Sequence, residues 1–268
     1  MTTNNFIKKC FSAGMALIVF TIPFLAIAED ESDPNILGLA LQSGSSYLGS
    51  NSNKISIVPI IMLANGPWFA QTTEGILETG FQQDFLKNYT IGIQLAYEDS
   101  RLQRDSSFLK QHNIGDIKAS ASYGAFLQYN NNLFQIIPID LLVRYRKDIN
   151  SARGSQLDLR LTTGVYGGEG KRLNVEAFAQ TTYANQNSSQ YYYGISQEQS
   201  LISTLNPYVN KSGFLSSQIG FWASYDVTTN WLLVGDIEVT RLQGDARNSP
   251  IVRNRTNNSA LIGLAYKY

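Results

Sequence analysis

The sequence predicts an all-β protein: a transmembrane, antiparallel, up-and-down β-barrel of about 12 strands that follows a cleaved signal peptide. Three observations lead to this fold. Apolar and polar residues alternate with a period of two in many segments, the linkers between these segments are alternately short and long, and the chain ends in an alternating strand whose last residue is aromatic. The composition agrees, because only 16% of the residues are charged whereas 12% are aromatic.

The first 28 residues have the features of a signal peptide. Lys8–Lys9 supply the positive region, residues 11–25 form an apolar segment, and the small residues Ala26 and Ala28 mark the cleavage site. A transmembrane anchor is the alternative, but the apolar segment is short for a span. We therefore expect residues 1–28 to be removed.

The mature chain, residues 29–268, is expected to form one barrel domain. Cleavage removes Cys10, the only cysteine, so the exported protein has neither a disulfide framework nor thiolate chemistry. Cleavage also lowers the basic residues from 21 to 19 against 21 acidic ones, because Lys8 and Lys9 are lost. A net charge of about −2 gives no indication of a nucleic-acid partner.

The alternating segments define the expected strands. In residues 115–129, for example, Tyr123, Ala125 and Leu127 share one face, whereas Ser122 and Gln128 lie on the other. We expect strands at 36–42, 54–63, 67–73, 75–83, 89–98, 115–129, 132–147, 155–167, 171–183, 213–226, 230–241 and 259–268.

The length of these strands favours a membrane barrel over a soluble β-sandwich. Many expected strands have ten or more residues, whereas strands in soluble sheets usually have about five or six. Charges also fall near the middle of several strands, as Arg144 and Asp158 do. A barrel with an apolar outside and a polar inside accommodates them and pairs every backbone group, which lipid requires.

The linkers support the same topology. Those at 64–66, 84–88, 130–131, 168–170 and 227–229 are short, whereas those at 43–53, 99–114, 148–154, 184–212 and 242–258 are mostly longer. Short turns on one side and long loops on the other are typical of outer-membrane barrels. One junction, 73–75, is an exception because two strands meet there with almost no loop, so a count of ten strands is the alternative.

The last strand indicates the cellular location. Leu264, Tyr266 and Tyr268 alternate on one face and end the chain, which resembles the C-terminal signal that the barrel assembly machinery of Gram-negative bacteria recognises. The alternative is an ordinary edge strand that ends in tyrosine. We expect a cell outer-membrane protein with its C-terminus in the periplasm, in contact with lipid and lipopolysaccharide.

Several motifs together resemble one family. They are "SSYLGS" (45–50), "PWFAQTTEGI" (67–76), "NIGDIKASASYG" (113–124), "YYYGIS" (191–196), "YDVTTNW" (225–231) and "LQGDARNSPIV" (242–252). In this order they resemble the MipA/OmpV family, the MltA-interacting proteins. The resemblance implies an outer-membrane β-barrel. It also implies a structural or scaffolding role that links the outer membrane to murein (peptidoglycan) remodelling, through a murein lytic transglycosylase and a murein synthase.

The last of these motifs contains residues that would suggest a catalytic loop in a soluble enzyme. Gly244, Asp245, Ser249 and Pro250 instead read as the turn where a strand leaves the bilayer, because the residue before proline avoids the helical region and proline cannot serve a central ladder. The loop also carries three arginines, for which we expect contact with lipopolysaccharide: Arg247, Arg253 and Arg255.

We expect no catalytic site, no metal site and no cofactor. His112 is the only histidine, and no serine signature adjoins it. A hydrolase that assembles a triad around His112 from distant residues is the alternative.

The inward charges have two interpretations. They are Asp116, Lys118, Asp140, Arg144, Arg146, Asp158, Arg160 and Glu176. One interpretation is an internal ion-pair network that fills the barrel, and the other is a small aqueous pore lined by both signs of charge. Two functions follow: a scaffold for murein enzymes, or a small passive or solute-selective outer-membrane channel.

Overall fold

The structure is a computed structural model that describes residues 35–73, 76–133, 137–168 and 170–268. These residues belong to the second of two compact units, Asp33–Tyr268. The expected signal peptide, including Ala26 and Ala28, lies outside the described residues.

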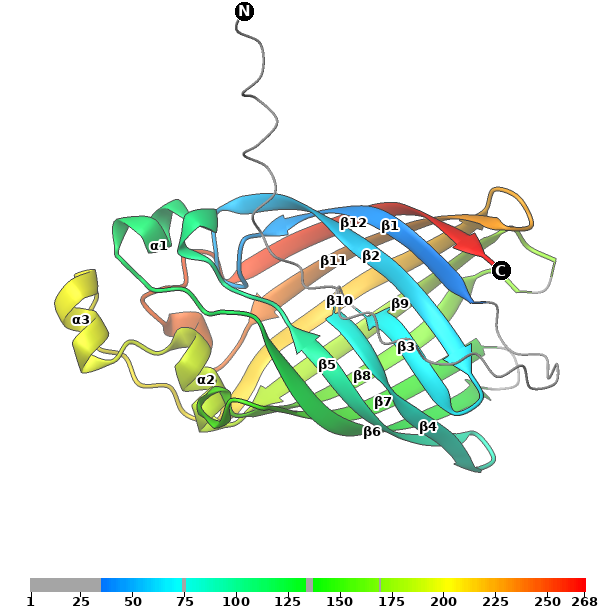
Figure 1. The fold of residues 1–268 in the computed structure, drawn as a ribbon, viewed down its shortest axis with the longest axis horizontal. Helices are drawn as coiled ribbons and strands as arrows, with labels where there is room; N and C mark the ends of the chain where they lie inside the picture. The colour runs from blue at the N-terminus through cyan, green and yellow to red at the C-terminus, as the bar shows by residue number, and fades with distance from the viewer. Residues whose placement is uncertain (1–34, 74–75, 134–136, 169) are drawn as a thin grey trace, which may run out of the picture. The chain divides into compact units, whose positions relative to one another are not determined.

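The described chain forms a closed antiparallel β-barrel (Figure 1). Each strand pairs with the next, and β1 pairs with β12 from Ile36↔Lys267 to Ser43↔Ala260, which closes the barrel. The predicted fold is therefore confirmed with 12 strands, and the alternative of ten is wrong. The strands are β1 (Ile36–Ser45), β2 (Asn53–Asn65), β3 (Trp68–Thr73), β4 (Ile76–Leu86), β5 (Tyr89–Glu98), β6 (Ser120–Leu133), β7 (Ile137–Asp148), β8 (Ser155–Tyr166), β9 (Leu173–Ala184), β10 (Gly213–Asp226), β11 (Trp231–Leu242) and β12 (Thr256–Lys267).

The period-two alternation separates the two faces of the wall. On β5, Ile93 and Leu95 point outward and are 63% and 57% exposed, whereas Gln94 between them points inward and is 5% exposed. Large inward rings fit because glycines face them: a Cβ at Gly220 would lie 2.5 Å from the Phe178 ring. The outside is thus an apolar surface suited to lipid, and the inside is mixed.

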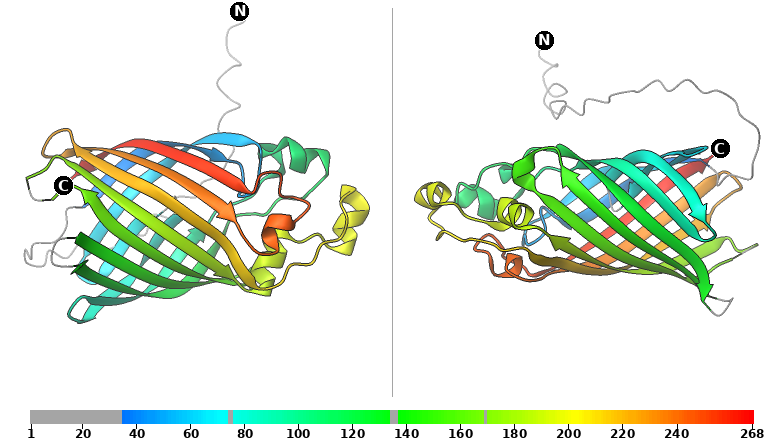
Figure 2. Two further views of the ribbon diagram at one scale, coloured as in Figure 1. Left: turned by 180° about the vertical axis from the view of Figure 1, so that it is seen from behind. Right: turned by 90° about the horizontal axis from the view of Figure 1, so that it is seen from below.

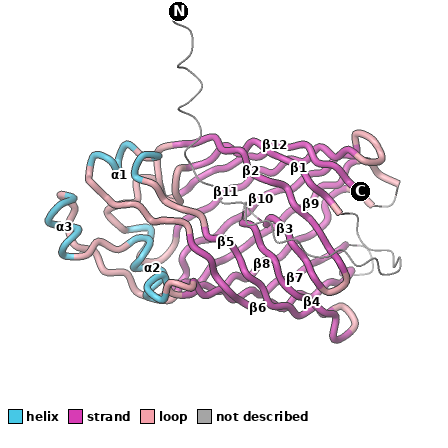
Figure 3. Tube along the Cα trace, viewed as in Figure 1, coloured by secondary structure: helices cyan, strands magenta, loops and turns pink. Residues whose placement is uncertain are grey.

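The two ends of the barrel differ. All the helical turns lie at one end, which we call the loop end, and β12 finishes at the other, the turn end (Figures 1, 2 and 3). The helices are α1 (Ser107–Gln111), α2 (Gln186–Tyr193) and α3 (Gln197–Ser203), with 3₁₀ turns η1 (Gln103–Asp105), η2 (Ser151–Arg153) and η3 (Ala246–Asn248). None of the helices in the described chain is long and apolar enough to span a membrane.

Local sequence fixes where these short helices begin. Asn185 accepts a hydrogen bond from the Ser188 amide and caps α2. Ser196 and Gln199 form a reciprocal capping box at the start of α3.

Two predicted boundaries are wrong around β6. The strand begins at Ser120 rather than 115, because Ile117 bridges Arg101 within a loop and is buried there. At its other end β6 runs through the asparagines that were expected to form the turn, and Asn130 pairs with Asp140 of β7. The β6–β7 hairpin therefore extends beyond its neighbours at the turn end.

The β3–β4 hairpin is much shorter than the others. β3 has 6 residues, and Thr73 already pairs with Ile76 of β4. The ladder between β3 and β2 includes only Met62–Asn65 of β2, although β2 pairs with β1 as far as Asn53. The wall therefore has a step between β2 and β5 on the loop-end side.

Candidate functional site in the barrel interior and its cap

A buried ion-pair network crosses the inner wall from β4 to β8. Arg144 Nη1 lies 2.5 Å from Glu78 Oε1, and Arg144 Nη2 lies 3.1 Å from Asp158 Oδ2. Arg146 contacts the same Asp158 oxygen at 3.2 Å and Glu98 Oε1 at 2.8 Å. Arg144 and Asp158 are 2% and 0% exposed, so both signs of charge are neutralised inside the protein.

Neutral groups complete the network. Gln94 donates to Glu78 at 3.1 Å, and the Thr182 hydroxyl donates to Asp158 at 2.8 Å. Each buried carboxylate therefore has more than one partner, which is the condition under which such charges persist in a low dielectric. The predicted residues Arg144, Arg146 and Asp158 are brought together here.

Three further predicted lumen charges lie toward the turn end. The Arg160 guanidinium stacks 3.9 Å from the centroid of the Phe178 ring, and Asp140 accepts a hydrogen bond from Gln128. Asp140 and Glu176 also line a hollow of about 330 Å³ at that end, together with Asn88 and Asn130–Asn132.

Asp116 and Lys118 require a correction, because they are not in the lumen. Both are exposed in the β5–β6 loop, and Asp116 accepts a hydrogen bond from the Gln103 amide at 2.6 Å. The alternation in residues 115–119 reflects burial of Ile117 (4% exposed) within the loops rather than strand geometry.

The loops at the loop end pack into a common core, which we call the cap. Its buried residues come from three loops and the strand ends beside them: Leu109, Ile114, Ala184, Tyr193, Ile195, Leu215, Leu242, Ala246 and Ile251. The Tyr193 hydroxyl donates to the Leu48 carbonyl at 3.1 Å, and Arg101 donates to the Tyr192 carbonyl at 2.6 Å. The long loop after β9 thus closes over the barrel mouth instead of standing free.

The motif at 242–256 is part of this cap. The buried Ser249 hydroxyl donates to the Tyr193 carbonyl at 2.5 Å, and Asp245 accepts from the Lys211 amide at 3.1 Å. Gly244 has φ +52°, a left-handed conformation that glycine adopts without strain, and Pro250 follows Ser249 directly. These four residues hold the loop against its neighbour.

The three arginines of this loop are all exposed. Arg253 lies over the Phe108 ring at 4.9 Å, and Arg255 donates to the Arg247 carbonyl at 3.2 Å. Their guanidinium groups therefore stand at the outer surface of the cap.

His112 also belongs to the cap. Its Nδ1 lies 3.2 Å from the Ser203 carbonyl oxygen and 3.1 Å from the Thr204 hydroxyl, and its ring packs on Phe108. It joins the β5–β6 loop to the β9–β10 loop. Within the described ranges, no three His, Cys, Asp or Glu side chains lie close enough to hold a metal ion.

Burial shifts the pKa values of two tyrosines and one arginine in the cap. Burial, reinforced by the nearby Glu98 carboxylate, raises the pKa of Tyr192 to about 12. Burial also raises the pKa of Tyr193 and lowers the pKa of Arg101, which lies close to both tyrosines. Neutral tyrosines are therefore part of the packed state of the cap.

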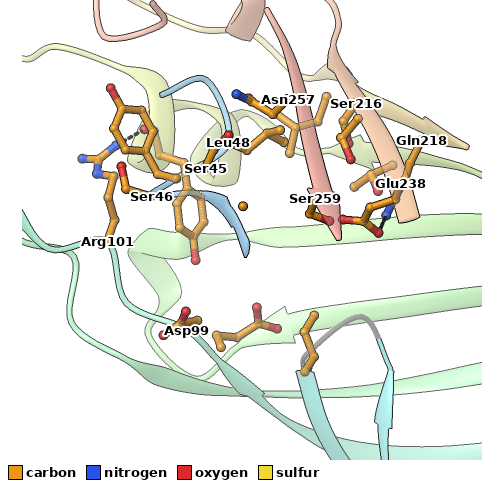
Figure 4. A pocket seen from close by; sticks show the side chains of 18 of the residues that line it. Ser45, Ser46, Leu48, Asp99, Arg101, Ser216, Gln218, Glu238, Asn257 and Ser259 are labelled. Carbon is orange, nitrogen blue, oxygen red and sulfur yellow. Dashed lines mark hydrogen bonds between the residues drawn. The ribbon is translucent and has the colours of Figure 1, made fainter. Parts of the chain in front are cut away.

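A vestibule lies beneath the cap (Figure 4). Its volume is about 450 Å³, and amide and hydroxyl side chains such as Gln42, Gln218 and Ser259 supply much of its wall. A second cavity of about 300 Å³ shares Gln42 and Glu238 with the vestibule and shares Glu176 with the turn-end hollow. The three hollows thus adjoin one another along the barrel.

The C-terminal residues are placed on the outside. Leu264, Tyr266 and Tyr268 are 47%, 40% and 57% exposed, and the Tyr268 amide donates to the Asn35 carbonyl at 3.0 Å. Tyr266 packs against Trp231 at the turn end, with ring centroids 5.2 Å apart.

The sequence reasoning overlooked the acidic partners of the network. Glu78 and Glu98 both lie in expected strands, and the signal was available for Glu78, which occupies an inward position of β4. Only the register between distant strands shows that they meet Arg144 and Arg146.

Comparison with known proteins gives the following matches. The family model described as MltA-interacting protein MipA matches residues 37–268. Curated proteins named MltA-interacting protein, from Escherichia coli (strain K12) and Shigella flexneri, are each 31% identical over 84 residues. That segment covers 31% of this chain and 34% of each relative, so it spans about a third of the curated relatives' length.

Solved structures share the fold. LpxR from Salmonella typhimurium has a TM-score of 0.50 at 8% identity, with 86% of this chain and 100% of that chain covered. The NanC porin has a TM-score of 0.49 at 12% identity, with coverage of 86% and 100%. At such low identity the likeness concerns the barrel fold alone.

Proposed function

Because the chain belongs to the family of MltA-interacting protein MipA, we propose that it is a non-enzymatic outer-membrane barrel that docks murein-remodelling enzymes, with a lytic transglycosylase as the first partner. A murein synthase would be a further partner, as expected for a scaffold. No step of this proposal requires a cofactor.

In this proposal the turn end is the docking side. The final strand of such barrels ends in the periplasm, so the turn end faces the murein and the cap faces outward. Signal cleavage near Ala28 and recognition of the C-terminal strand by the barrel assembly machinery belong to the same proposal.

One observation carries the docking proposal: the polar hollow at the turn end. It has a volume of about 330 Å³ and lies beside the projecting β6–β7 hairpin. The exposed amides of Asn131 and Asn132 stand at its rim, and Asp140 and Glu176 lie in its wall. Amide rims and carboxylate walls suit a partner that inserts a basic side chain.

The test is binding of a purified murein lytic transglycosylase to this protein in lipid nanodiscs. We expect the double variant Asn131→Arg/Asn132→Arg to weaken binding by about tenfold or more, because like charge would meet the inserted group. Asn248→Arg is the matched control, because Asn248 is also exposed but lies in the cap. Absence of binding by the unaltered protein, or equal loss in the control, would contradict the proposal.

A channel is the second candidate, and the adjoining hollows favour it. The second cavity shares lining residues with the vestibule on one side and with the turn-end hollow on the other. Both signs of charge line this route, so little ion selectivity is expected. Planar-bilayer recordings test this function, and folded protein without single-channel steps would exclude it.

The outward face carries a separate proposal. The exposed guanidinium groups of Arg247, Arg253 and Arg255 would pair with lipopolysaccharide phosphates. Charge-neutral substitution at all three positions should lower lipopolysaccharide binding, and unchanged binding would refute the contact.

The absence of enzymatic activity is also part of the proposal. His112 is engaged with the Ser203 carbonyl and the Thr204 hydroxyl rather than with a serine and an acid. Loss of a lipase or protease activity of the purified protein in His112→Ala would overturn this assignment.

A further inference from the structure

The step in the barrel wall leaves one strand edge without a neighbour. Met62–Asn65 of β2 pair with β3, whereas Asn53–Ile60 pair with β1 only, within the described part of the chain. The last contact on the β3 side is made by a side chain, because the Ile61 amide donates to the Thr72 hydroxyl at 3.0 Å. The backbone ladder between β2 and β3 therefore ends before Ile61.

Pro59 lies on the unpaired edge. The Ile61 amide and carbonyl both face Thr72, and residues two apart in a strand direct their backbone groups to the same side. Pro59 therefore faces the open side, where it has no N–H to leave unpaired. The sequence thus suits an exposed edge at the place where the structure has one.

An ion pair bounds this opening on the loop-end side. Lys54 Nζ at the start of β2 lies 3.8 Å from Asp99 Oδ2, one residue beyond β5. The last described pair of the β3–β4 hairpin, Thr73↔Ile76, lies on its turn-end side. We call the space between these limits the β2–β5 portal.

Both interior cavities reach the portal. The vestibule is lined by Lys54 and Ser56, and the second cavity is lined by Pro59, Ile61 and Thr72. Ile61 and Pro59 alternate with the lumen-facing Val58 and Ile60, so the second cavity touches residues of both faces of β2. The second cavity therefore reaches the unpaired edge of β2.

The surface outside the portal is strongly apolar. Ile55 and Ile57, on the unpaired edge of β2, are 77% and 71% exposed. Such a surface faces the hydrocarbon of the bilayer. A molecule at the portal is therefore a lipid-phase molecule rather than a solute from water.

The cavities differ in chemistry. The second cavity has a largely apolar side formed by Val58, Ile60, Phe178, Trp222, Leu232 and Leu261. Its wall also carries four charged residues: Arg160, Glu176, Asp236 and Glu238. The vestibule offers amides and hydroxyls, and its three basic residues (Lys54, Arg101, Arg146) are matched by three acidic ones (Glu98, Asp99, Glu238). Two ion pairs join these residues: Arg146 pairs with Glu98, and Lys54 pairs with Asp99.

From these contacts we propose that the barrel interior binds a single-chain amphiphile with an uncharged or zwitterionic head, which enters from the outer leaflet through the β2–β5 portal. The acyl chain occupies the second cavity and the head occupies the vestibule. The two volumes, about 450 and 300 Å³, lie within the range of small-ligand sites. The second cavity adjoins the docking hollow at the turn end, with which it shares Thr162 and Glu176, but the portal opens on the loop-end side of the β3–β4 hairpin.

Trp222 provides a direct test, because it lines the second cavity. A variant with Trp68→Phe and Trp231→Phe keeps Trp222 as the single tryptophan and removes the two exposed ones. It is placed in phosphatidylcholine vesicles and titrated with lysophosphatidylcholine that carries bromine on its chain. We expect saturable quenching of Trp222, whereas two-chain brominated phosphatidylcholine in the bilayer should quench it little.

A larger side chain in the second cavity tests whether the lysolipid binds there. In the same background, Val58→Phe should raise the lysolipid concentration for half quenching by about tenfold or more. Leu39→Phe is the matched control, because Leu39 lies opposite Pro59 on β1 but faces lipid at 63% exposure. Ser56→Phe replaces Val58→Phe if that variant does not insert. Equal quenching by both brominated lipids, or quenching unaltered by the filling variant, would overturn the proposal.

Discussion

Replacement of Arg144 by methionine should strongly destabilise the barrel. Arg144 is 2% exposed and is the group that links Glu78 of β4 to Asp158 of β8. Methionine fills much of the same space but leaves both carboxylates without this cation. The effect expected for a broken buried ion pair is about 3–5 kcal/mol of unfolding free energy.

The remaining contacts place the loss near the lower end of that range. Asp158 keeps Arg146 at 3.2 Å and Thr182 at 2.8 Å, and Glu78 keeps Gln94 at 3.1 Å. We therefore expect a loss of about 3 kcal/mol, which is roughly a 150-fold change in the folding equilibrium.

The assay is urea unfolding in lipid vesicles, followed by tryptophan emission. The second variant, Arg144→Met/Glu78→Gln, removes the orphaned charge and should recover at least about half of the loss, because an amide is cheaper to bury than a carboxylate. Arg247→Met, at an exposed cap position, is the control and should change stability by less than about 0.5 kcal/mol. If Arg144→Met lost less than about 1 kcal/mol of unfolding free energy, the network would contribute no more than a surface ion pair does. If the double variant recovered none of the loss, the unpaired Glu78 carboxylate would not be its cause.

Three further outcomes are expected. Burial raises the pKa of Tyr192 from 10 to about 12, so its neutral form stabilises the cap fully below pH 10, and this contribution is lost as pH rises through about 12; the protection factors of the cap amides, which correct for base catalysis of exchange, should fall in that window, and unchanged protection factors would refute it. Ser249→Ala removes the bond to the Tyr193 carbonyl and should weaken the cap by about 1–3 kcal/mol, seen as faster proteolysis of the loops while the strands stay intact. Gly220→Val would place a Cβ 2.5 Å from the Phe178 ring and should cost about 1–3 kcal/mol in urea unfolding, a loss that Phe178→Leu in the same chain should partly restore.

The strands could be predicted closely because lipid outside and water inside impose a strict alternation. β5 and β10 match their expected bounds, and most others differ by one to three residues. The errors at β6 have a physical origin. Ile117 is buried in the cap and imitates a strand position, and the asparagines at 130–132 continue the ladder because their hairpin projects beyond its neighbours.

The candidate site could be predicted only in part. Inward positions of Arg144, Arg146 and Asp158 follow from the alternation within each strand. Their pairing with Glu78 depends on side chains that meet over several strands, which no local pattern encodes. The packing of the cap is equally non-local, since Ser249 meets Tyr193 across 56 residues.

The tight junction at 73–75 is the most informative anomaly, because it links the network to the portal. Because β3 and β4 turn back early, residues 53–60 of β2 have no backbone partner on the β3 side within the described part of the chain. The ion pairs that anchor β4 and β5 to the wall are in the same region: Glu78 of β4 is held by Arg144, and Glu98 of β5 is held by Arg146. A rigid frame of buried charges on one side would let an opening persist in the bilayer without collapse of the barrel. On this argument, Arg144→Met should lower not only the stability of the barrel but also the saturable quenching of Trp222, although Arg144 lines neither cavity.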